Sequence, residues 1–186
     1  MVPRLLEKYR NEIVPKLMAD FKLKNKMAVP RVEKIVVNMG VGEGTQDIKV
    51  LEKSVEELAN ITGQKPVIRR AKKAIANFKV RQGQAVGAKV TLRRAMMYEF
   101  MDRLLNIALP RIRDFRGVPR DSFDQGNNYT LGLSEQIIFP EIEYDRITRT
   151  QGMDITFVIK NAKNADQARA LLKHFGMPFS REGEEK

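Results

Sequence analysis

The stretch Arg31-Val-Glu-Lys-Ile-Val-Val-Asn-Met39 decides the fold, because it has the alternating pattern of a β-strand. Successive side chains of a strand point to opposite faces of the sheet. The apolar side chains therefore share one face: Ile35, Val37 and Met39. The other face carries Lys34, Val36 and Asn38. The pattern predicts a sheet with one face in the core and the other face largely polar.

Further helices and strands are expected on both sides of this strand. Apolar spacing predicts helices at residues 5–21 (broken or kinked at Pro15), 47–61, 95–108 (ending before Pro110) and 164–175. Alternation predicts strands at residues 66–70, 86–94, 129–133 and 153–160. We expect an α+β fold: one domain over residues 1–180, a mostly antiparallel sheet, helices packed on one face, a protruding basic loop, and a flexible tail at residues 181–186.

The net charge of +11 is unevenly distributed along the chain. Residues 65–120 carry 15 basic and 3 acidic side chains, whereas the flanking segments are close to neutral or acidic. Solubility alone does not require such a concentration of one sign. A nucleic acid is the first candidate partner for it. An anionic membrane is the weaker alternative, because most of the charge falls on strand- and loop-like sequence rather than on an amphipathic helix.

The strongest part of this charge is Arg69-Arg-Ala-Lys-Lys-Ala-Ile-Ala-Asn-Phe-Lys-Val-Arg81. Cations neutralise phosphates and release counterions, and Phe78 could stack on a base. The structural alternative is a solvated basic hairpin with Phe78 in the core. No carboxylate occurs from residue 64 to residue 97, which favours the nucleic acid.

A second basic cluster is Pro110-Arg-Ile-Arg-Asp-Phe-Arg-Gly-Val-Pro-Arg120, within an aperiodic segment at residues 111–128. The planar guanidinium of arginine suits bidentate contacts with phosphate. Arg111, Arg113 and Arg116 are therefore candidates for contact with RNA or a protein partner. The alternative is that they hold the loop through internal ion pairs, for example with Asp114.

Composition argues against several other functions. The chain has no cysteine and one histidine, His174, so we expect no metal site and no cofactor. It has no long apolar run typical of a membrane span or a signal peptide, so we expect a cytoplasmic protein. Gly40-Val-Gly-Glu-Gly-Thr45 lacks the spacing of a nucleotide-binding loop and is interpreted as a turn. Glu141, Glu143 and Asp145 are interpreted as a solvated strand edge, with contact to a basic protein partner as the alternative.

Several blocks of the sequence resemble one known family. They are Val29-Pro-Arg-Val-Glu-Lys-Ile-Val-Val-Asn-Met-Gly-Val-Gly42, Ile61-Thr-Gly-Gln-Lys-Pro66, residues 71–83, Gly87-Ala-Lys-Val-Thr-Leu-Arg93, Leu109-Pro-Arg-Ile-Arg-Asp-Phe-Arg-Gly117, Glu135-Gln-Ile-Ile-Phe-Pro-Glu-Ile142 and Gly152-Met-Asp-Ile-Thr156. In their order and over nearly the whole chain, these blocks resemble the fifth protein of the large ribosomal subunit in its bacterial form.

The resemblance implies a structural constituent of the large ribosomal subunit that is not an enzyme. It implies attachment of 5S rRNA to the large-subunit rRNA in the central protuberance, and contact with a small-subunit protein across an intersubunit bridge. The 5S rRNA-binding candidates that it implies are Asn38, Gln64, Lys65, Thr91 and Arg93. It also implies contact with the peptidyl-site tRNA through Lys72, Lys73, Phe78, Lys79, Arg81 and Gln82.

The sequence departs from the family pattern in two places. Phe123-Asp-Gln-Gly-Asn-Asn-Tyr129 stands where the family usually has Phe-Asp-Gly-Arg-Gly-Asn-Tyr, so one arginine and one glycine are missing. Residues 159–165 differ from the commoner threonine-rich version, and residues 181–186 form a longer and more acidic tail. The first departure removes any contact that the family makes through that arginine.

Two other functions share part of this evidence. An RNA- or DNA-binding regulator or chaperone outside the ribosome would need the same positive charge. A small α+β enzyme acting on a phosphorylated substrate would use the arginines, but it also needs a convergent base or nucleophile, which the sequence does not supply.

Overall fold

The computed structural model describes residues 2–45, 47–142 and 149–180. Five strands form one sheet in the order β2-β3-β1-β5-β4. Their bounds are β1 Arg31–Gly40, β2 Val67–Arg70, β3 Ala85–Leu92, β4 Tyr129–Leu133 and β5 Met153–Lys160. Helices accompany the sheet, so the predicted α+β fold with an antiparallel sheet is confirmed. The predicted tail, together with Glu143 and Asp145, lies outside the described residues.

The chain forms two compact units that share strands. The first contains the residues up to Ile35, Arg93–Leu131 and those from Thr156 on, and the second contains Val36–Leu92 and Gly132–Ile155. Each of β1, β4 and β5 contributes residues to both units. The single domain that the sequence suggests therefore stays a prediction.

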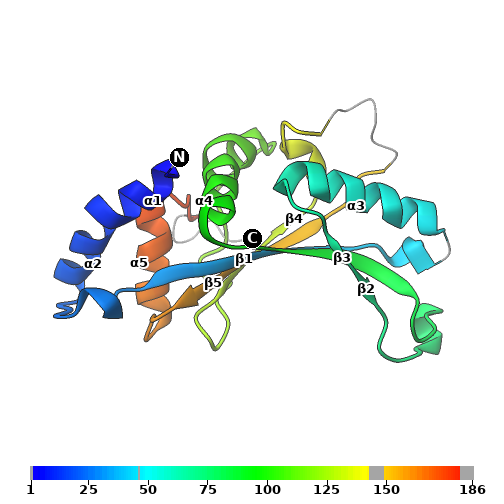
Figure 1. Ribbon diagram of the computed structural model, residues 1–186, viewed down its shortest axis with the longest axis horizontal. Coiled ribbons are helices and arrows are strands. Elements are labelled where there is room, and N and C mark those ends of the chain that lie inside the picture. Colours follow the sequence, from blue (N-terminus) through cyan, green and yellow to red (C-terminus); the bar gives the residue numbers. More distant parts are fainter. Residues whose placement is uncertain (1, 46, 143–148, 181–186) are drawn as a thin grey trace. The chain divides into compact units, whose positions relative to one another are not determined.

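The second unit contains α3 (Ile48–Thr62), which packs against β3 (Figure 1). Asp47 caps its first turn by accepting from the Lys49 amide, and Gly63 ends it at a φ of 68°. The helix buries Leu51, Leu58 and Ile61 completely. The bounds of α3 agree closely with the helix predicted at residues 47–61.

Strand β1 confirms the alternation on which the fold prediction rests. Ile35, Val37 and Met39 are fully buried, while Asn38 and Lys34 are only partly buried. Strand β5 shows the same alternation: every second residue is buried, namely Met153, Ile155, Phe157 and Ile159. One face of each strand is therefore core, and the side chains between are accessible.

Among its described residues, the first unit has these α-helices: α1 (Arg4–Lys8), α2 (Val14–Asp20), α4 (Arg94–Arg103) and α5 (Ala165–Phe175). Tyr9 stacks on Phe175 with ring centroids 5.9 Å apart, and its hydroxyl donates to the Pro30 carbonyl. Asn164 caps the start of α5 and Gly176 ends it, so the helix agrees with the predicted range 164–175.

The helices are irregular near two prolines, Pro15 and Pro110. The regular α-helix is interrupted just before Pro15 by the π-helical turn Tyr9–Ile13, and α2 then runs through the proline. After α4 the chain passes through the π-helical turn Leu104–Ala108, which ends before Pro110 as predicted. A 3₁₀ turn, Leu109–Arg111, contains that proline near its start, where no amide donor is needed.

Candidate nucleic-acid interface

One candidate surface in the second unit is formed by Asn38, Gln64, Lys65 and Thr91, here called the polar sheet surface. Asn38 and Thr91 lie on the accessible side of β1 and β3, which are neighbours in the sheet. Gln64 and Lys65 are exposed at the connection from α3 to β2. The side-chain amide of Gln64 donates to the Thr91 carbonyl oxygen at 3.4 Å. The structure thus brings a residue of the connection onto the strand, as a shared binding surface requires.

The connection that carries Gln64 and Lys65 is held by a buried threonine. The hydroxyl of Thr62 donates to the Leu58 carbonyl at 2.7 Å and accepts from the Gln64 amide at 3.4 Å. Strand β2 then pairs antiparallel with β3, with Val67 opposite Lys89. In this register the start of β2 lies beside the end of β3, where Thr91 is located.

Arg93 is the fifth predicted 5S rRNA-binding residue, and its position differs from the expectation. The sequence predicts a strand over residues 86–94 that would include Arg93, but β3 ends at Leu92. Arg93 has extended backbone at the N-cap of α4, is exposed, and falls in the first unit. The extended backbone ends after Arg93, because Arg94 takes a left-handed φ of 52°.

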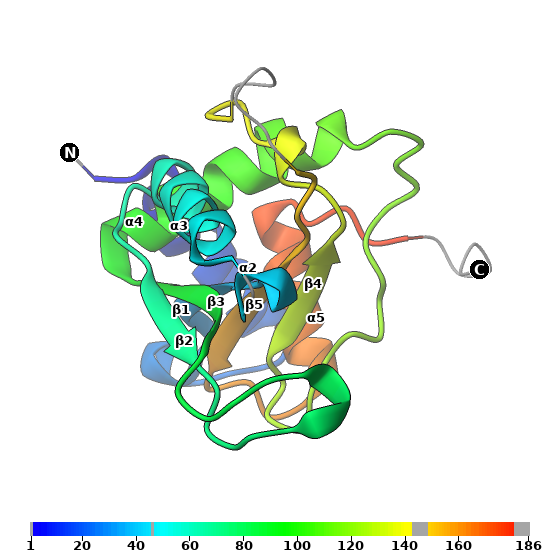
Figure 2. The same cartoon turned by 90° about the vertical axis from the view of Figure 1, so that its right-hand side faces the viewer.

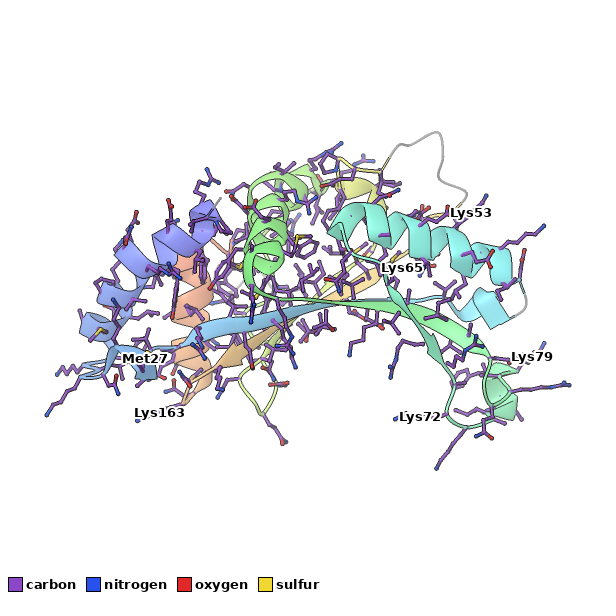
Figure 3. The ribbon with its side chains drawn as sticks, in the orientation of Figure 1. Met27, Lys53, Lys65, Lys72, Lys79 and Lys163 are labelled. Atoms are coloured by element: carbon purple, nitrogen blue, oxygen red, sulfur yellow. The ribbon has the colours of Figure 1, made fainter. Side chains whose placement is uncertain are left out.

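The second candidate surface is the basic loop, residues 71–84, between β2 and β3. All six predicted tRNA-binding residues are exposed: Lys72, Lys73, Phe78, Lys79, Arg81 and Gln82. The loop lies at the end of the β2–β3 hairpin, away from α3 (Figure 2), and Lys72 and Lys79 point into solvent (Figure 3). Phe78 is 74% exposed, so the alternative that it is a core residue is wrong.

The basic loop has its own internal structure. Ile75 and Val80 form an antiparallel bridge with amide-to-carbonyl distances of 2.9 and 3.2 Å. At the base of the loop, the Ala71 amide donates to the Gln84 carbonyl, and the Gly83 amide donates back to the Ala71 carbonyl. Lys79 takes a left-handed φ of 52° to turn the chain. These bonds order the backbone that carries the exposed cations.

An open cleft of about 880 Å³ lies between the basic loop and the end of β1. Its apolar lining comes from Ile75, Phe78, Val80 and Val86. Its cations are Lys72, Lys73, Lys79 and Arg149. None of the described residues that line it is acidic. The sequence pattern identified the loop but gave no sign of this cleft, because Arg149 and Gln151 reach it only through the fold.

A buried glutamine fixes the far wall of the cleft. Gln136 is fully buried, its Nε2 donates to the Arg149 carbonyl at 2.7 Å, and its Oε1 accepts from the Gln151 amide at 2.6 Å. Gln151 in turn donates to the Gly40 carbonyl at 2.8 Å. Gln136 also approaches Glu57 of α3 at 3.4 Å, and burial raises the pKa of that carboxyl. Sequence reasoning missed Gln136, although it lies within the resembling block at residues 135–142.

The arginine-rich segment belongs to the first unit, and Arg111, Arg113 and Arg116 are all exposed. Arg113 approaches Asp114 at 3.8 Å, with both side chains almost fully in solvent, so this pair adds little stability. Further along, Val118 forms a β-bridge with Phe179. The Val118 amide donates to the Pro178 carbonyl, and the Ser180 amide donates to the Val118 carbonyl. The segment is thus anchored at Val118, with the three arginines accessible.

The segment that departs from the family pattern forms a closed turn. The Asp124 carboxylate accepts from the amides of Gly126 and Asn128 at 2.9 and 2.8 Å and from the Asn128 side chain at 2.9 Å. The Asn128 side-chain bond is the main reason that the pKa of Asp124 is lowered. The turn therefore has a structural role that does not depend on an arginine.

The histidine and the glycine-rich turn singled out in the sequence have these positions. His174 lies 3.3 Å from Asp20 in an ion-pair position, and Gly42–Thr45 is a 3₁₀ turn. The described residues contain no group of three or more His, Cys, Asp or Glu side chains placed to hold a metal ion. No helix within the described ranges is long and apolar enough to cross a membrane.

An α+β fold with an accessible polar sheet surface and a structured, carboxylate-free basic loop has the features of a nucleic-acid-binding protein. Comparison with known families makes this specific. A family model described as "Ribosomal protein L5" matches residues 25–81, and one described as "ribosomal L5P family C-terminus" matches residues 85–179.

Similar proteins cover almost the entire chain. Proteins named "Large ribosomal subunit protein uL5" include one from Clostridium acetobutylicum that is 57% identical over 97% of this chain and 99% of its own length. Another, from Trichlorobacter lovleyi, is 56% identical over 95% of this chain and 98% of its own length. The chain belongs to the ribosomal protein L5 family, in its bacterial form. It is therefore a structural, non-enzymatic component of the cytoplasmic ribosome, and the enzyme alternative is wrong.

Proposed function

We propose that this protein binds 5S rRNA through the polar sheet surface and Arg93, and so helps to attach it to the large-subunit rRNA in the central protuberance. The observation that carries the proposal is the hydrogen bond from Gln64 to the Thr91 carbonyl, which joins the α3–β2 connection to β3 on one accessible surface. Amide, hydroxyl and ammonium groups on a sheet suit the phosphates, riboses and 2′-hydroxyls of folded RNA, because A-form grooves limit direct base reading.

The basic loop serves a second RNA, the peptidyl-site tRNA. Its six exposed residues lie at the far end of the β2–β3 hairpin, and Lys65 of the polar sheet surface lies at its near end (Figure 3). Arg111, Arg113 and Arg116 are exposed candidates for a further contact with rRNA or a protein partner. A small-subunit protein across an intersubunit bridge completes the proposed set of partners.

Charge reversal in the basic loop tests this division of labour. We expect Lys72→Glu, Lys73→Glu and Arg81→Glu together to weaken tRNA binding to ribosomes at least tenfold and to leave 5S rRNA binding within about twofold, because each lost phosphate contact removes counterion release at that surface only. Filter binding measures the 5S complex of the purified protein, and tRNA dissociation from reconstituted ribosomes measures the other contact. If 5S affinity falls as far as tRNA affinity, the two surfaces are not separate.

A further inference from the structure

We infer that the cleft beside the basic loop takes one unstacked nucleotide of the bound tRNA, with its base against Phe78 and its phosphate among the surrounding lysines. This inference rests on the proposed tRNA contact and goes beyond it: it predicts that one base is inserted, in place of a contact with the RNA backbone alone.

The first argument is the exposure of Phe78. A phenylalanine that is 74% exposed among lysines leaves a large apolar ring in water, and it lines a cleft together with Ile75, Val80 and Val86. A nucleobase offers a flat face that covers such a ring, and stacking tolerates any base. The ring is also not needed for the fold, since the Ile75–Val80 bridge and the loop-base bonds hold the loop without it.

The second argument is the charge around the apolar lining. Lys72, Lys73 and Lys79 line the cleft from the basic loop and Arg149 lines it from the opposite wall, with no acidic side chain among the described lining residues. A neutral apolar ligand would not need these cations, whereas a nucleotide brings its anionic phosphate with the base.

The third argument concerns size and shape. A volume of about 880 Å³ is in the range of small-molecule sites and admits a nucleotide, but a concave cleft cannot receive the regular surface of a stacked A-form helix. The nucleotide must therefore be splayed out of its stack. Both walls are already fixed, one by the bonds within the loop and the other by Gln136 and Gln151, so little ordering is required on binding.

Crosslinking from the cleft is the first test. A photoreactive benzoyl-phenylalanine replaces Phe78 in complete ribosomes that hold tRNA in the peptidyl site. We expect crosslinks to the base of one tRNA nucleotide. Crosslinks to ribosomal RNA, to a ribosomal protein, or to several scattered tRNA nucleotides would overturn the inference.

Affinity measurements on the same ribosomes are the second test. We expect Phe78→Ala to speed tRNA dissociation about tenfold and Phe78→Tyr to retain most of the binding, because tyrosine keeps the stacking ring. A tRNA that lacks the base at the crosslinked position should dissociate from unmodified ribosomes about as fast as normal tRNA dissociates from the Phe78→Ala ribosomes. Combining the abasic tRNA with Phe78→Ala should speed dissociation little further. Met27→Ala is the matched control, since Met27 is 72% exposed and lies outside the cleft.

Salt dependence separates this inference from the proposed tRNA contact. Phe78→Ala should leave the salt slope of binding unchanged, and Lys79→Ala should reduce it by about one. If the lysine variant weakens binding while Phe78→Ala does not, the nucleotide site is wrong and the tRNA contact stands. If neither variant changes tRNA binding, the nucleotide site and the proposed tRNA contact are both wrong.

Discussion

Gly87 in β3 shows how a single residue sets the spacing of two strands. A Cβ atom at this position would collide with the Met39 carbonyl oxygen of β1, which is backbone and cannot move aside. We expect Gly87→Ala to lower the free energy of unfolding by about 1–3 kcal/mol, the usual cost of overpacking. Urea denaturation measures it.

Gly132→Ala in β4 is the matched control for Gly87→Ala. A Cβ there would meet only the Asp154 side chain, at an ordinary contact distance of 3.7 Å. This variant should stay within about 0.5 kcal/mol of the parent protein. If Gly87→Ala and Gly132→Ala lower the free energy of unfolding equally, the close approach of β1 and β3 is contradicted.

The same residues show the limit of reasoning from sequence. Alternation predicted which side chains of β1 are buried, because burial on one face leaves a local pattern. Nothing local indicated that Gly87 faces the Met39 carbonyl or that Gln136 bonds Arg149 and Gln151, because these contacts join segments far apart in the chain. The part of the cleft wall formed by Arg149 and Gln151 was therefore unpredictable.

At the scale of elements, the turn at residues 123–129 yields a prediction about pH. Hydrogen bonds to the carboxylate lower the pKa of Asp124, so its stabilisation is complete above the ordinary value of 3.8 and is lost as the pH falls below it. We expect Asp124→Ala to cost about 1 kcal/mol at neutral pH. Thermal unfolding at a series of pH values should show that difference shrinking below pH 3.8. A difference that is constant across the series would mean that the charge of Asp124 is irrelevant to the turn.

Regular elements were predictable where their ends have chemical signals. Asp47 and Gly63 mark α3, and Asn164 and Gly176 mark α5. The π-helical turns Tyr9–Ile13 and Leu104–Ala108 were missed, because one extra residue in a turn barely disturbs the apolar spacing. The order within the basic loop was also not predicted, since most of its bonds are between backbone groups and do not depend on residue type, although the Gln84 side chain also accepts from the Arg81 amide.

At the scale of the whole molecule, positive charge is concentrated where the accessible sheet residues and the hairpin loop occur. Residues 65–120 contain 15 of the 34 lysines and arginines and only 3 of the 23 acidic residues. The family explains this asymmetry, because a ribosomal protein works among RNA phosphates. Charge alone could not separate a ribosomal protein from a free RNA-binding regulator; the family match over nearly the whole chain did.

The most direct test is the affinity of the purified protein for 5S rRNA across a salt series, with two lysine variants that differ only in place. Lys65 belongs to the polar sheet surface, and Lys53 is an exposed lysine of α3 in the same unit (Figure 3). We predict tight binding at low ionic strength, a clear loss and a salt slope reduced by about one for Lys65→Ala, and no comparable change for Lys53→Ala. Absence of 5S binding at low ionic strength, or equal effects of the two variants, would contradict the account.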